Sequence, residues 1–440
     1  MIKMINYPIN LSLEWESMDI KSIADVIMGQ SPQSKYYNEN LEGMPFLQGN
    51  KTFGDKYPTF ELYTTSIKKI AEKGSVLMSV RAPVGDLNIA TEDICIGRGV
   101  CSLKMKRGEN EFLYYLLKSN ISSLINRESG TVFGSVNKND IESFEVKIPK
   151  DIETQNQILT ILKNIDEKII VCKQINHNLF IVIDNIFKNY VNDYDDLNIV
   201  SLSDNTQKII RGFNSKYVEE SNLINFNQKV NKGTFLEKQH FKFLNEDIEV
   251  PKEKFAKKRD VLINSLGDGT VGRPHYYNED TDNVVVDQHI TIIRANEDLI
   301  PSTYIYEYLK NPTGQSHLDS LVSGSTGMLM LNISEIRNLK IPVLNKKQLI
   351  EFDSIVTPLF DKITKNYDEI QSLSKLRDTL LPKLMSGEID VSEVNCDLKL
   401  LIKKFILKII KYYGRFKYEN KINFKNTKSN ETFFKPRPIS

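Results

Sequence analysis

Two long stretches of this chain carry apolar residues at alternating steps of four and three positions. The first stretch runs from residue 157 to residue 190 and contains neither glycine nor proline. This heptad spacing predicts a long helix that packs along a second long helix. One position of the seam is polar, Asn176, and the apolar positions are Ile158, Leu162, Ile165, Ile169, Cys172, Leu179, Ile183, Ile186 and Tyr190.

The second stretch runs from residue 349 to residue 384 and is a displaced copy of the first. A shift of 194 positions places Ile158 on Phe352 and Ile169 on Ile363. Pro358 lies inside this stretch and predicts a kink or a restart, because proline lacks the amide hydrogen that a helix uses. The seam positions are Leu349, Phe352, Val356, Leu359, Ile363, Asn366, Ile370, Leu373, Arg377, Leu380 and Leu384.

The segments that precede the two helical stretches also repeat each other. The first segment predicts a strand, turn and strand over residues 74–90, a strand over 101–106, a helix over 110–126 and a closing strand over 141–148. The second repeats this order over residues 259–277, 289–296, 302–311 and 323–342. We therefore predict an α+β fold with two similar α/β domains and two long antiparallel coiled-coil helices, related by a pseudo-twofold axis.

The predicted order along the chain is domain, spacer helix, domain, spacer helix and tail. The expected boundaries are residues 14–150, 151–196, 197–344, 345–395 and 396–440. The two domains share their apolar positions and differ in the polar residues of their loops. Because apolar positions specify a fold and loop residues specify what is bound, this pattern favours two similar domains that bind different targets.

One register aligns the two predicted helices along their whole seams. In an antiparallel pair, residues at one level have numbers with a constant sum, and placing Asn176 level with Asn366 sets that sum at 542. The remaining seam pairs are then apolar, except that Ile165 faces Arg377, whose guanidinium is expected to reach solvent. A buried amide pair would fix the register, because slippage would place each amide against an apolar neighbour.

Charge is unevenly distributed along the 440 residues. The net charge is +1, yet residues 397–440 hold 12 Lys and Arg against 3 Asp and Glu. This tail predicts a basic amphipathic helix, which could lie on acidic protein, nucleic acid or a membrane surface, or be a solvated appendage. The rest of the chain carries −8, so DNA binding by that part would need local basic patches or the charge of a partner.

The four cysteines show no zinc-binding spacing, and the chain starts without an apolar signal core. No apolar run is long enough to span a bilayer. Free thiols and the absence of a leader predict a cytoplasmic protein with no metal site and no membrane association.

Two short motifs invite a catalytic interpretation and do not support one. Gly267 to Gly272 is a G-x-G-x-x-G, but no apolar helical run follows it to meet a dinucleotide. Glu145 and Lys147 have the E-x-K spacing of metal-dependent nucleases, although the copy at Asn338 and Lys340 lacks the carboxylate. No phosphate-binding loop and no amino-methyltransferase tetrapeptide is present. We therefore predict no catalytic residue, cofactor or metal in this chain.

Polar and aromatic residues gather in the predicted loops of both domains. Arg, Asn and Gln make bidentate contacts with base edges, whereas Lys, Ser and Tyr more often hold phosphates. The candidate DNA-binding residues of the first domain are Gln30, Ser31, Lys35, Tyr36, Gln48, Asn50, Lys51, Arg81 and Arg98. Those of the second domain are Arg211, Lys216, Gln228, Arg273, His275, Gln288 and His289, of which Arg273 and His275 are expected on an exposed glycine-rich turn.

This ordered, duplicated set of features resembles the specificity subunit of type I restriction–modification systems. The resemblance covers roughly residues 14–395, whereas the tail after Asn395 is not part of the usual pattern. It rests on Gly29, Ser31 and Pro32 at the first domain start, the strands VLMSVRAPVG and VLINSLGDGTVG, the domain ends FEVKIP and LKIP, and the closing segment KLRDTLLPKLMSGEIDV from Lys375 to Val391.

The resemblance implies a non-catalytic DNA-binding subunit with two target-recognition domains. Each domain would recognise one half of a bipartite, asymmetric target in double-stranded DNA. The helices would hold the halves apart and dock two methyltransferase subunits that bind S-adenosylmethionine. Restriction subunits would then join and cleave DNA with ATP.

Two alternatives from other classes remain open at the level of the sequence. One is a single-chain metal-dependent nuclease that uses Glu145 and Lys147. The other is a structural coiled-coil adaptor that makes no contact with DNA. The purified chain incubated with DNA and magnesium would distinguish the first, and a mobility shift with and without methyltransferase would distinguish the second.

Overall fold

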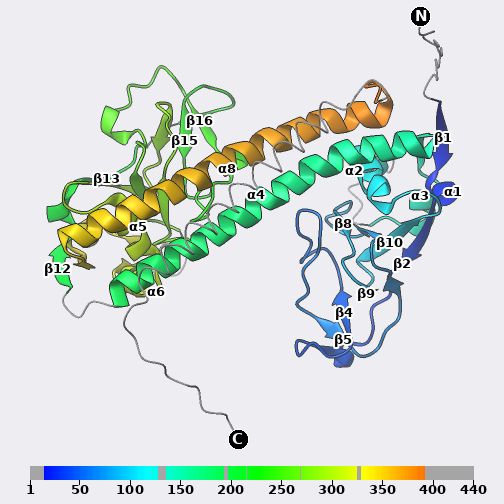
Figure 1. Ribbon diagram of the computed structural model, residues 1–440, viewed down its shortest axis with the longest axis horizontal. Coiled ribbons are helices and arrows are strands. Elements are labelled where there is room, and N and C mark those ends of the chain that lie inside the picture. The colour runs from blue at the N-terminus through cyan, green and yellow to red at the C-terminus, as the bar shows by residue number, and fades with distance from the viewer. Residues whose placement is uncertain are drawn as a thin grey trace, which may run out of the picture. The chain divides into compact units, whose positions relative to one another are not determined.

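A computed structural model describes residues 14–126, 135–192, 197–214, 216–267, 269–324 and 329–391 (Figure 1). The basic tail expected over residues 396–440 lies outside these residues. The chain divides into two compact units. Unit 1 contains the residues up to 167 together with those from 373 onward, and unit 2 contains residues 168–372. Each unit therefore includes a part of both long helices.

Each of the two apolar seams lies on one uninterrupted long helix. Helix α4 spans Ile152–Asn192 and helix α8 spans Lys346–Ser386. The expected restart at Pro358 is wrong, because α8 runs through it as one element. Pro358 is exposed, while Val356 and Phe360 on either side of it are buried in the core of unit 2. Packing of these side chains offsets the hydrogen bond that the proline removes.

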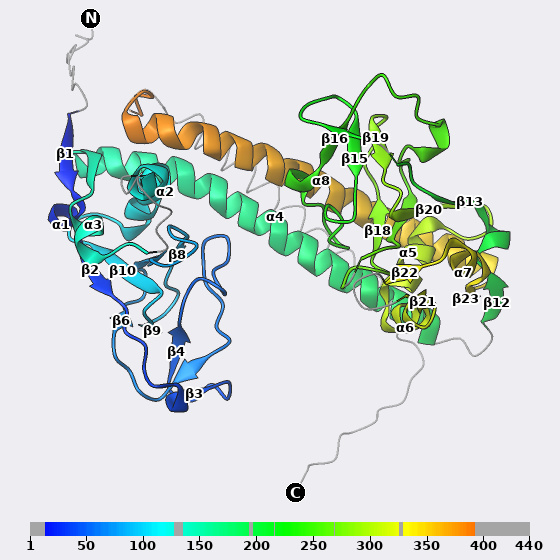
Figure 2. The ribbon, with the colours of Figure 1, turned by 180° about the vertical axis from the view of Figure 1, so that it is seen from behind.

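In unit 2 the two helices pack antiparallel, side by side in both views (Figures 1 and 2). The rings of Tyr190 and Phe352 lie 5.8 Å apart, centroid to centroid. Asn366 Nδ2 donates to Asn176 Oδ1 at 2.7 Å, and Asn176 Nδ2 donates to the carbonyl of Ile363 at 3.2 Å. Both asparagines are buried, with 3% and 1% of their surface exposed. The two pairs each sum to 542, the register expected for these helices.

In unit 1 Arg377 lies against a buried carboxylate, which corrects the expectation that it reaches solvent. Its Nη1 donates to Asp166 Oδ1 at 3.0 Å, and the hydroxyl of Tyr115 donates to Asp166 Oδ2 at 2.5 Å. The side chain of Asp166 is 7% exposed and that of Arg377 is 19% exposed. Asp166 directly follows the seam residue Ile165, so the guanidinium meets it before reaching water.

Besides the long helices, the described residues of unit 1 form three sheets and three helices. A two-stranded ribbon has the order β1-β11, a four-stranded sheet has the order β2-β10-β7-β8, and a five-stranded sheet has the order β3-β5-β4-β9-β6. The strands are β1 (Trp15–Asp19), β2 (Ala24–Met28), β3 (Tyr37–Asn38), β4 (Met44–Leu47), β5 (Tyr63–Thr64), β6 (Ile70–Ala71), β7 (Val76–Ser79), β8 (Leu87–Ile89), β9 (Ile94–Ile96), β10 (Val100–Met105) and β11 (Glu145–Pro149). The helices are α1 (Ile20–Ile23), α2 (Asn110–Asn126) and α3 (Lys138–Glu142).

Unit 2 repeats this arrangement of strands. The ribbon β12-β23 corresponds to β1-β11, the sheet β13-β20-β17-β18 to β2-β10-β7-β8, and the sheet β14-β16-β15-β19 to β3-β5-β4-β9. The strands are β12 (Asn198–Ser201), β13 (Thr206–Arg211), β14 (Tyr217–Val218), β15 (Ile224–Phe226), β16 (Lys242–Leu244), β17 (Asp260–Asn264), β18 (Pro274–Tyr277), β19 (Val284–Val286), β20 (Ile290–Ala295), β21 (Val322–Ser323), β22 (Met330–Leu331) and β23 (Lys340–Val343). The helices are α5 (Ser302–Lys310), α6 (Pro312–Ser320) and α7 (Ile333–Asn338).

Local sequence explains where the elements differ from expectation. The closing strand expected over residues 141–148 begins only at Glu145, because Asn137 and Asp140 form a capping box that starts α3. In unit 2 the helix corresponding to α2 is divided. Pro312 cannot continue α5, and the side chain of Asn311 caps the new helix α6 by accepting from the amide of Gly314.

Within each unit one of the shorter helices, α2 or α5, packs against the long helices. In unit 1, Leu113 and Leu117 of α2 share a buried core with Ile158 of α4 and Leu384 of α8. Unit 2 has a corresponding core, formed by Tyr304 and Ile305 of α5, Phe187 of α4 and Phe352 of α8. The sheets are thus attached to the long helices through buried apolar surface, which is the largest favourable contribution to folding.

A buried acid in unit 2 should make stability depend on pH. Glu307 of α5 is 1% exposed, and Lys310 Nζ lies 3.1 Å from its Oε1 and 2.5 Å from Asp184 Oδ1 on α4. Burial raises the pKa of Glu307 from 4.5 to about 8. The pKa of Glu307 is therefore higher in the folded protein than in the unfolded chain, so the folded protein keeps this proton up to a higher pH. The free energy of unfolding consequently falls as pH rises between 4.5 and 8.

Between pH 6 and pH 9 the wild-type protein should lose stability. In Glu307→Gln we expect this loss to be smaller by roughly 1–2 kcal/mol. Glutamine keeps an oxygen that accepts from Lys310 and carries no charge at either pH. Denaturant unfolding at both pH values measures the difference. An equal loss in the wild-type protein and the variant would mean that Glu307 is already ionised at pH 6.

Candidate nucleic-acid interface

Six of the nine candidate residues of the first domain line one hollow in unit 1. The hollow has a volume of about 400 Å³ and is open to solvent. Strands β4 and β9 are parallel, with Phe46 paired to Cys95, so their carboxyl ends lie at one edge of the sheet. The loops that leave these ends, together with those after β2 and β7, supply the lining residues Ser31, Gln48, Asn50, Lys51, Arg81 and Arg98.

Backbone hydrogen bonds hold the loops of the hollow close together. The amide of Gly29 donates to the carbonyl of Val100 at 3.0 Å, and the amide of Gly97 donates to Leu47 at 2.8 Å. The amide of Arg98 donates to Ser31 Oγ at 3.1 Å. A Cβ at Gly29 would lie only 2.2 Å from the carbonyl oxygen of Gly97, so this approach of two backbones requires glycine.

Two arginines of the hollow carry charges that no carboxylate among the described residues neutralises. Lys51 Nζ forms an ion pair with Glu61 at 2.8 Å, and Asn50 Nδ2 donates to Asp86 at 2.6 Å. Arg81 and Arg98 are exposed, and neither guanidinium has a hydrogen-bonding or ionic partner among the described residues. Unpaired guanidinium groups above a rigid backbone are suited to binding phosphates or base edges.

Three candidates of the first domain lie outside this lining. Gln30 is exposed at the end of β2, where its amide donates to the carbonyl of Ile96 at 2.9 Å. Lys35 and Tyr36 are exposed on a short 3₁₀ turn over Ser34–Tyr36. The ammonium of Lys35 lies 4.9 Å from the centroid of the Tyr36 ring, so the two side chains form one cationic, aromatic surface.

In unit 2 the corresponding edge presents Gln288 and His289 after β19. Gln288 is exposed, and its side chain has no partner among the described residues. His289 Nδ1 lies 2.8 Å from Asp287 Oδ1. Gln228 follows β15 and is half-buried, with an Oε1 that has no hydrogen-bond partner in the described part of the chain. Lys216 is exposed just before β14.

The remaining candidates of the second domain have structural roles. Arg211 donates to the carbonyl of Leu331, and burial lowers the pKa of Arg211. Arg273 donates to the carbonyls of Asn231 at 3.1 Å and Gly269 at 3.2 Å. Both guanidinium groups therefore tie loops together instead of projecting freely into solvent.

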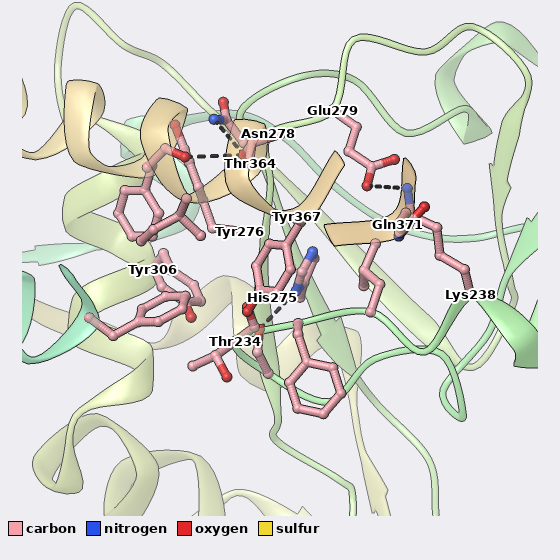
Figure 3. Close-up of a pocket in the computed structure, with 16 residues that line it drawn as sticks. Thr234, Lys238, His275, Tyr276, Asn278, Glu279, Tyr306, Thr364, Tyr367 and Gln371 are labelled. Carbon is pink, nitrogen blue, oxygen red and sulfur yellow. Dashed lines mark hydrogen bonds and ion pairs between the residues drawn. The ribbon is translucent and has the colours of Figure 1, made fainter. Parts of the chain in front are cut away.

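His275 is buried, which corrects its expected place on an exposed turn. It lies on β18, where 7% of its surface is exposed, and its Nδ1 is 2.8 Å from the carbonyl oxygen of Gly233. Figure 3 shows the ring in a small aromatic pocket beside Tyr276, Tyr306 and Tyr367. Burial lowers the pKa of His275 to about 4, so the ring is neutral at pH 7. A covered, neutral ring does not form part of a DNA-binding surface.

Sequence reasoning missed the carboxylates that organise these loops. Asp86 and Glu61 hold Asn50 and Lys51 in unit 1, as described above. In unit 2 Asp287 accepts from the hydroxyl of Tyr217 at 3.1 Å and from the amide of His289 at 2.9 Å. The only available indication was that Asp287 directly precedes two candidate residues, since no charge or spacing pattern distinguishes it from other loop acids.

The two motifs with catalytic spacing lie in ordinary structural positions. Glu145 and Lys147 are both exposed on β11, the solvent face of a two-stranded ribbon. The glycine-rich segment from Gly267 leads into strand β18 and not into a helix. Within the described residues no cluster of three or more His, Cys, Asp or Glu side chains is placed to bind a metal ion.

This chain is similar in sequence to known specificity subunits of type I restriction enzymes. A family model for the type I restriction modification DNA specificity domain matches residues 12–179. The putative type I restriction enzyme MjaX specificity subunit of Methanocaldococcus jannaschii is 40% identical over 160 residues, which are 36% of this chain and 37% of that relative. The type I restriction enzyme MjaIX specificity subunit of the same organism is 26% identical over 429 residues, with 87% of this chain and 95% of that relative covered.

A solved structure has the same fold. The crystal structure of the type I restriction–modification system S subunit from M. genitalium matches 86% of this chain and 98% of its own, with a TM-score of 0.59 and 18% identity. Among the described helices, none combines the length and the apolar character needed to cross a membrane. The duplicated sheets, the two long helices and the match to the specificity domain over residues 12–179 make this chain similar to the specificity subunits of type I restriction–modification systems.

Proposed function

We propose that each recognition domain, expected over residues 14–150 and 197–344, binds one half of a bipartite, asymmetric DNA target. The chain is the non-catalytic DNA-recognition subunit of its restriction–modification complex. The observation that carries the proposal is the hollow of unit 1, where the unpaired guanidinium groups of Arg81 and Arg98 lie beside the amide of Gln48. Guanidinium and amide groups are the ones that distinguish base edges in the major groove.

We further propose that the long helices dock two methyltransferase subunits, which bring S-adenosylmethionine, and that restriction subunits join this core. Specificity subunits of type I systems act together with methyltransferase and restriction subunits. In unit 2 the apolar side chains of Val171 and Val182 on α4 are 39% and 45% exposed, and their separation by about three helical turns places them on one side of the helix. Exposed apolar side chains grouped on one surface are typical of protein interfaces.

Charge supports a division of labour between the subunits. The chain outside its tail carries a net charge of −8, so its long-range field does not attract DNA. The two arginines of the hollow supply local positive charge, and a basic partner would supply the remaining phosphate contacts. We therefore expect tight binding of DNA by the complex with methyltransferase and weak binding by the chain alone.

Methylation mapping tests this function directly. Genomic DNA from cells with the methyltransferase subunit should carry one bipartite methylated motif when this chain is present and none when it is absent. If the chain were instead a nuclease, the purified chain alone would cleave DNA in the presence of magnesium. An adaptor without DNA contact would leave the methylated motif unchanged when the loops of both domains are replaced.

Replacing residues 14–150 with the corresponding domain of a homologous subunit should change one half of the methylated motif and leave the other half intact. The reason is that unit 1 holds its own complete recognition sheet and hollow, built from residues of the first domain. Sequencing of methylated sites in cells that express the chimaera gives the result. A change in both halves would show that the domains do not act independently.

A further inference from the structure

A four-residue turn follows the parallel strand pair in both units. In unit 1 it spans residues 97–100, and the amide of Val100 donates to the carbonyl of Gly97 at 3.0 Å. In unit 2 it spans residues 287–290, and the amide of Ile290 donates to the carbonyl of Asp287 at 3.0 Å. The second residue of the turn is Arg98 in the first case and Gln288 in the second.

The backbone around the two turns is the same. In the first turn the last residue is Val100, and its carbonyl accepts from the amide of Gly29 at 3.0 Å. In the second turn the last residue is Ile290, and its carbonyl accepts from the amide of Gly212 at 2.9 Å. A Cβ at either glycine would lie about 2 Å from the opposing carbonyl oxygen, at 2.2 Å from Gly97 and 2.1 Å from Asp287. Both turns are therefore held by the same close contact, and Arg98 and Gln288 occupy equivalent positions on equivalent scaffolds.

The two side chains share a further property. Each is exposed at the carboxyl edge of a parallel strand pair, and neither has a side-chain partner among the described residues. Arg81 is also unpaired, but three other neighbouring candidates, Lys51, His289 and Arg273, are engaged within the protein. An unengaged polar side chain on a rigid turn is available to an external ligand at no cost in internal hydrogen bonds.

We propose that Arg98 and Gln288 are equivalent base-reading residues, one in each domain, and that they specify a guanine in one half-site and an adenine in the other. The inference rests on the proposed DNA-recognition function and adds which residues select which bases. A guanidinium donates two parallel hydrogen bonds to O6 and N7 of guanine. A glutamine amide donates to N7 and accepts from N6 of adenine, so the two side chains at one position select different purines.

Reciprocal substitutions in the full chain, expressed with its methyltransferase subunit, test the assignment. Arg98→Gln should lower methylation of the wild-type motif roughly 10- to 100-fold and move one guanine position toward adenine, with the other half-site unchanged. Gln288→Arg should move one adenine position toward guanine in the other half-site. Lys147→Gln is the matched control, because it removes one positive charge from β11, a strand that contributes no residue to the hollow.

The possible outcomes distinguish a failure of the proposed recognition function from a failure of the base assignment. If the wild-type chain directs no motif, the proposed recognition function fails. If it directs a motif and Arg98→Gln weakens all sites equally without changing any base, Arg98 contacts phosphate and the base assignment is wrong. The same conclusion follows if both substitutions alter one half-site. Trp15 fluorescence for the unit 1 variants, far-UV circular dichroism for Gln288→Arg and the yield of the methyltransferase complex establish that each variant is folded.

Discussion

Replacing Arg377 with methionine should lower the free energy of unfolding by about 3–5 kcal/mol, because it leaves the carboxylate of Asp166 buried without its cation. Only 7% of the Asp166 side chain is exposed, and its second oxygen is already taken by the hydroxyl of Tyr115. Both partners lie in unit 1, as does the single tryptophan, Trp15. Denaturant unfolding followed by Trp15 fluorescence therefore measures the loss where it occurs.

Two further variants give this prediction a sharp control. Asp166→Leu combined with Arg377→Met should recover most of the loss, because a buried ion pair contributes little more than apolar groups of similar volume. Lys104→Met removes a cation whose pair with Glu72 is more than half exposed on both sides, and should change stability by less than about 1 kcal/mol. A cost of Arg377→Met as small as that of Lys104→Met would mean that Asp166 is hydrated.

Asn366→Leu should destabilise unit 2 by about 2–3 kcal/mol. The substitution removes the donor to Asn176 Oδ1 and leaves that oxygen buried between two helices. Replacing both asparagines by leucine should restore the stability and even exceed that of the wild-type protein, since apolar pairs fill such seams well. The double variant would lose the penalty against slippage, however, because leucine has no partner to lose in a shifted register.

Two measurements check this prediction. Denaturant unfolding followed by far-UV circular dichroism gives the stability of the single and double variants. Cysteines at positions 176 and 366, in a chain with Cys172→Ala, should form a disulfide on oxidation, because the side chains of Asn176 and Asn366 meet directly and a disulfide spans roughly 7 Å between Cα atoms. Failure of a folded protein to cross-link would contradict the register of Asn176 with Asn366.

The long helices could be predicted from the sequence because their apolar spacing extends over many heptads. The register followed from only two polar residues, Asn176 and Asn366. The interruption expected at Pro358 is absent from α8. Helix propensity accounts for the hydrogen bond that proline removes, but it does not include the packing of the buried neighbours Val356 and Phe360. The contact between Arg377 and Asp166 was also missed, since seam positions alone do not reveal which adjacent residue turns inward.

The loops were harder to interpret than the helices, for a physical reason. A free arginine and one that ties two loops together have the same side chain, and only the fold distinguishes Arg98 from Arg211 or Arg273. His275 belongs to a strand whose four residues are all buried. The glycines that precede this strand are typical of an exposed turn, so the sequence did not indicate that His275 is buried. Pairing of β4 with β9 brought the residues of the hollow together from positions up to 67 apart, such as Ser31 and Arg98.

The turns at residues 97–100 and 287–290 have a consequence for how targets change over evolutionary time. The side chains of Arg98 and Gln288 make no hydrogen bond or ion pair within the described part of the chain, so a mutation at either codon should change protein stability little. The glycines beneath them carry the whole structural constraint, and any larger residue there would disrupt the sheet edge. Selection can therefore redirect such a subunit to new genomic sites by single nucleotide changes, one half-site at a time, while purging variation at the glycines.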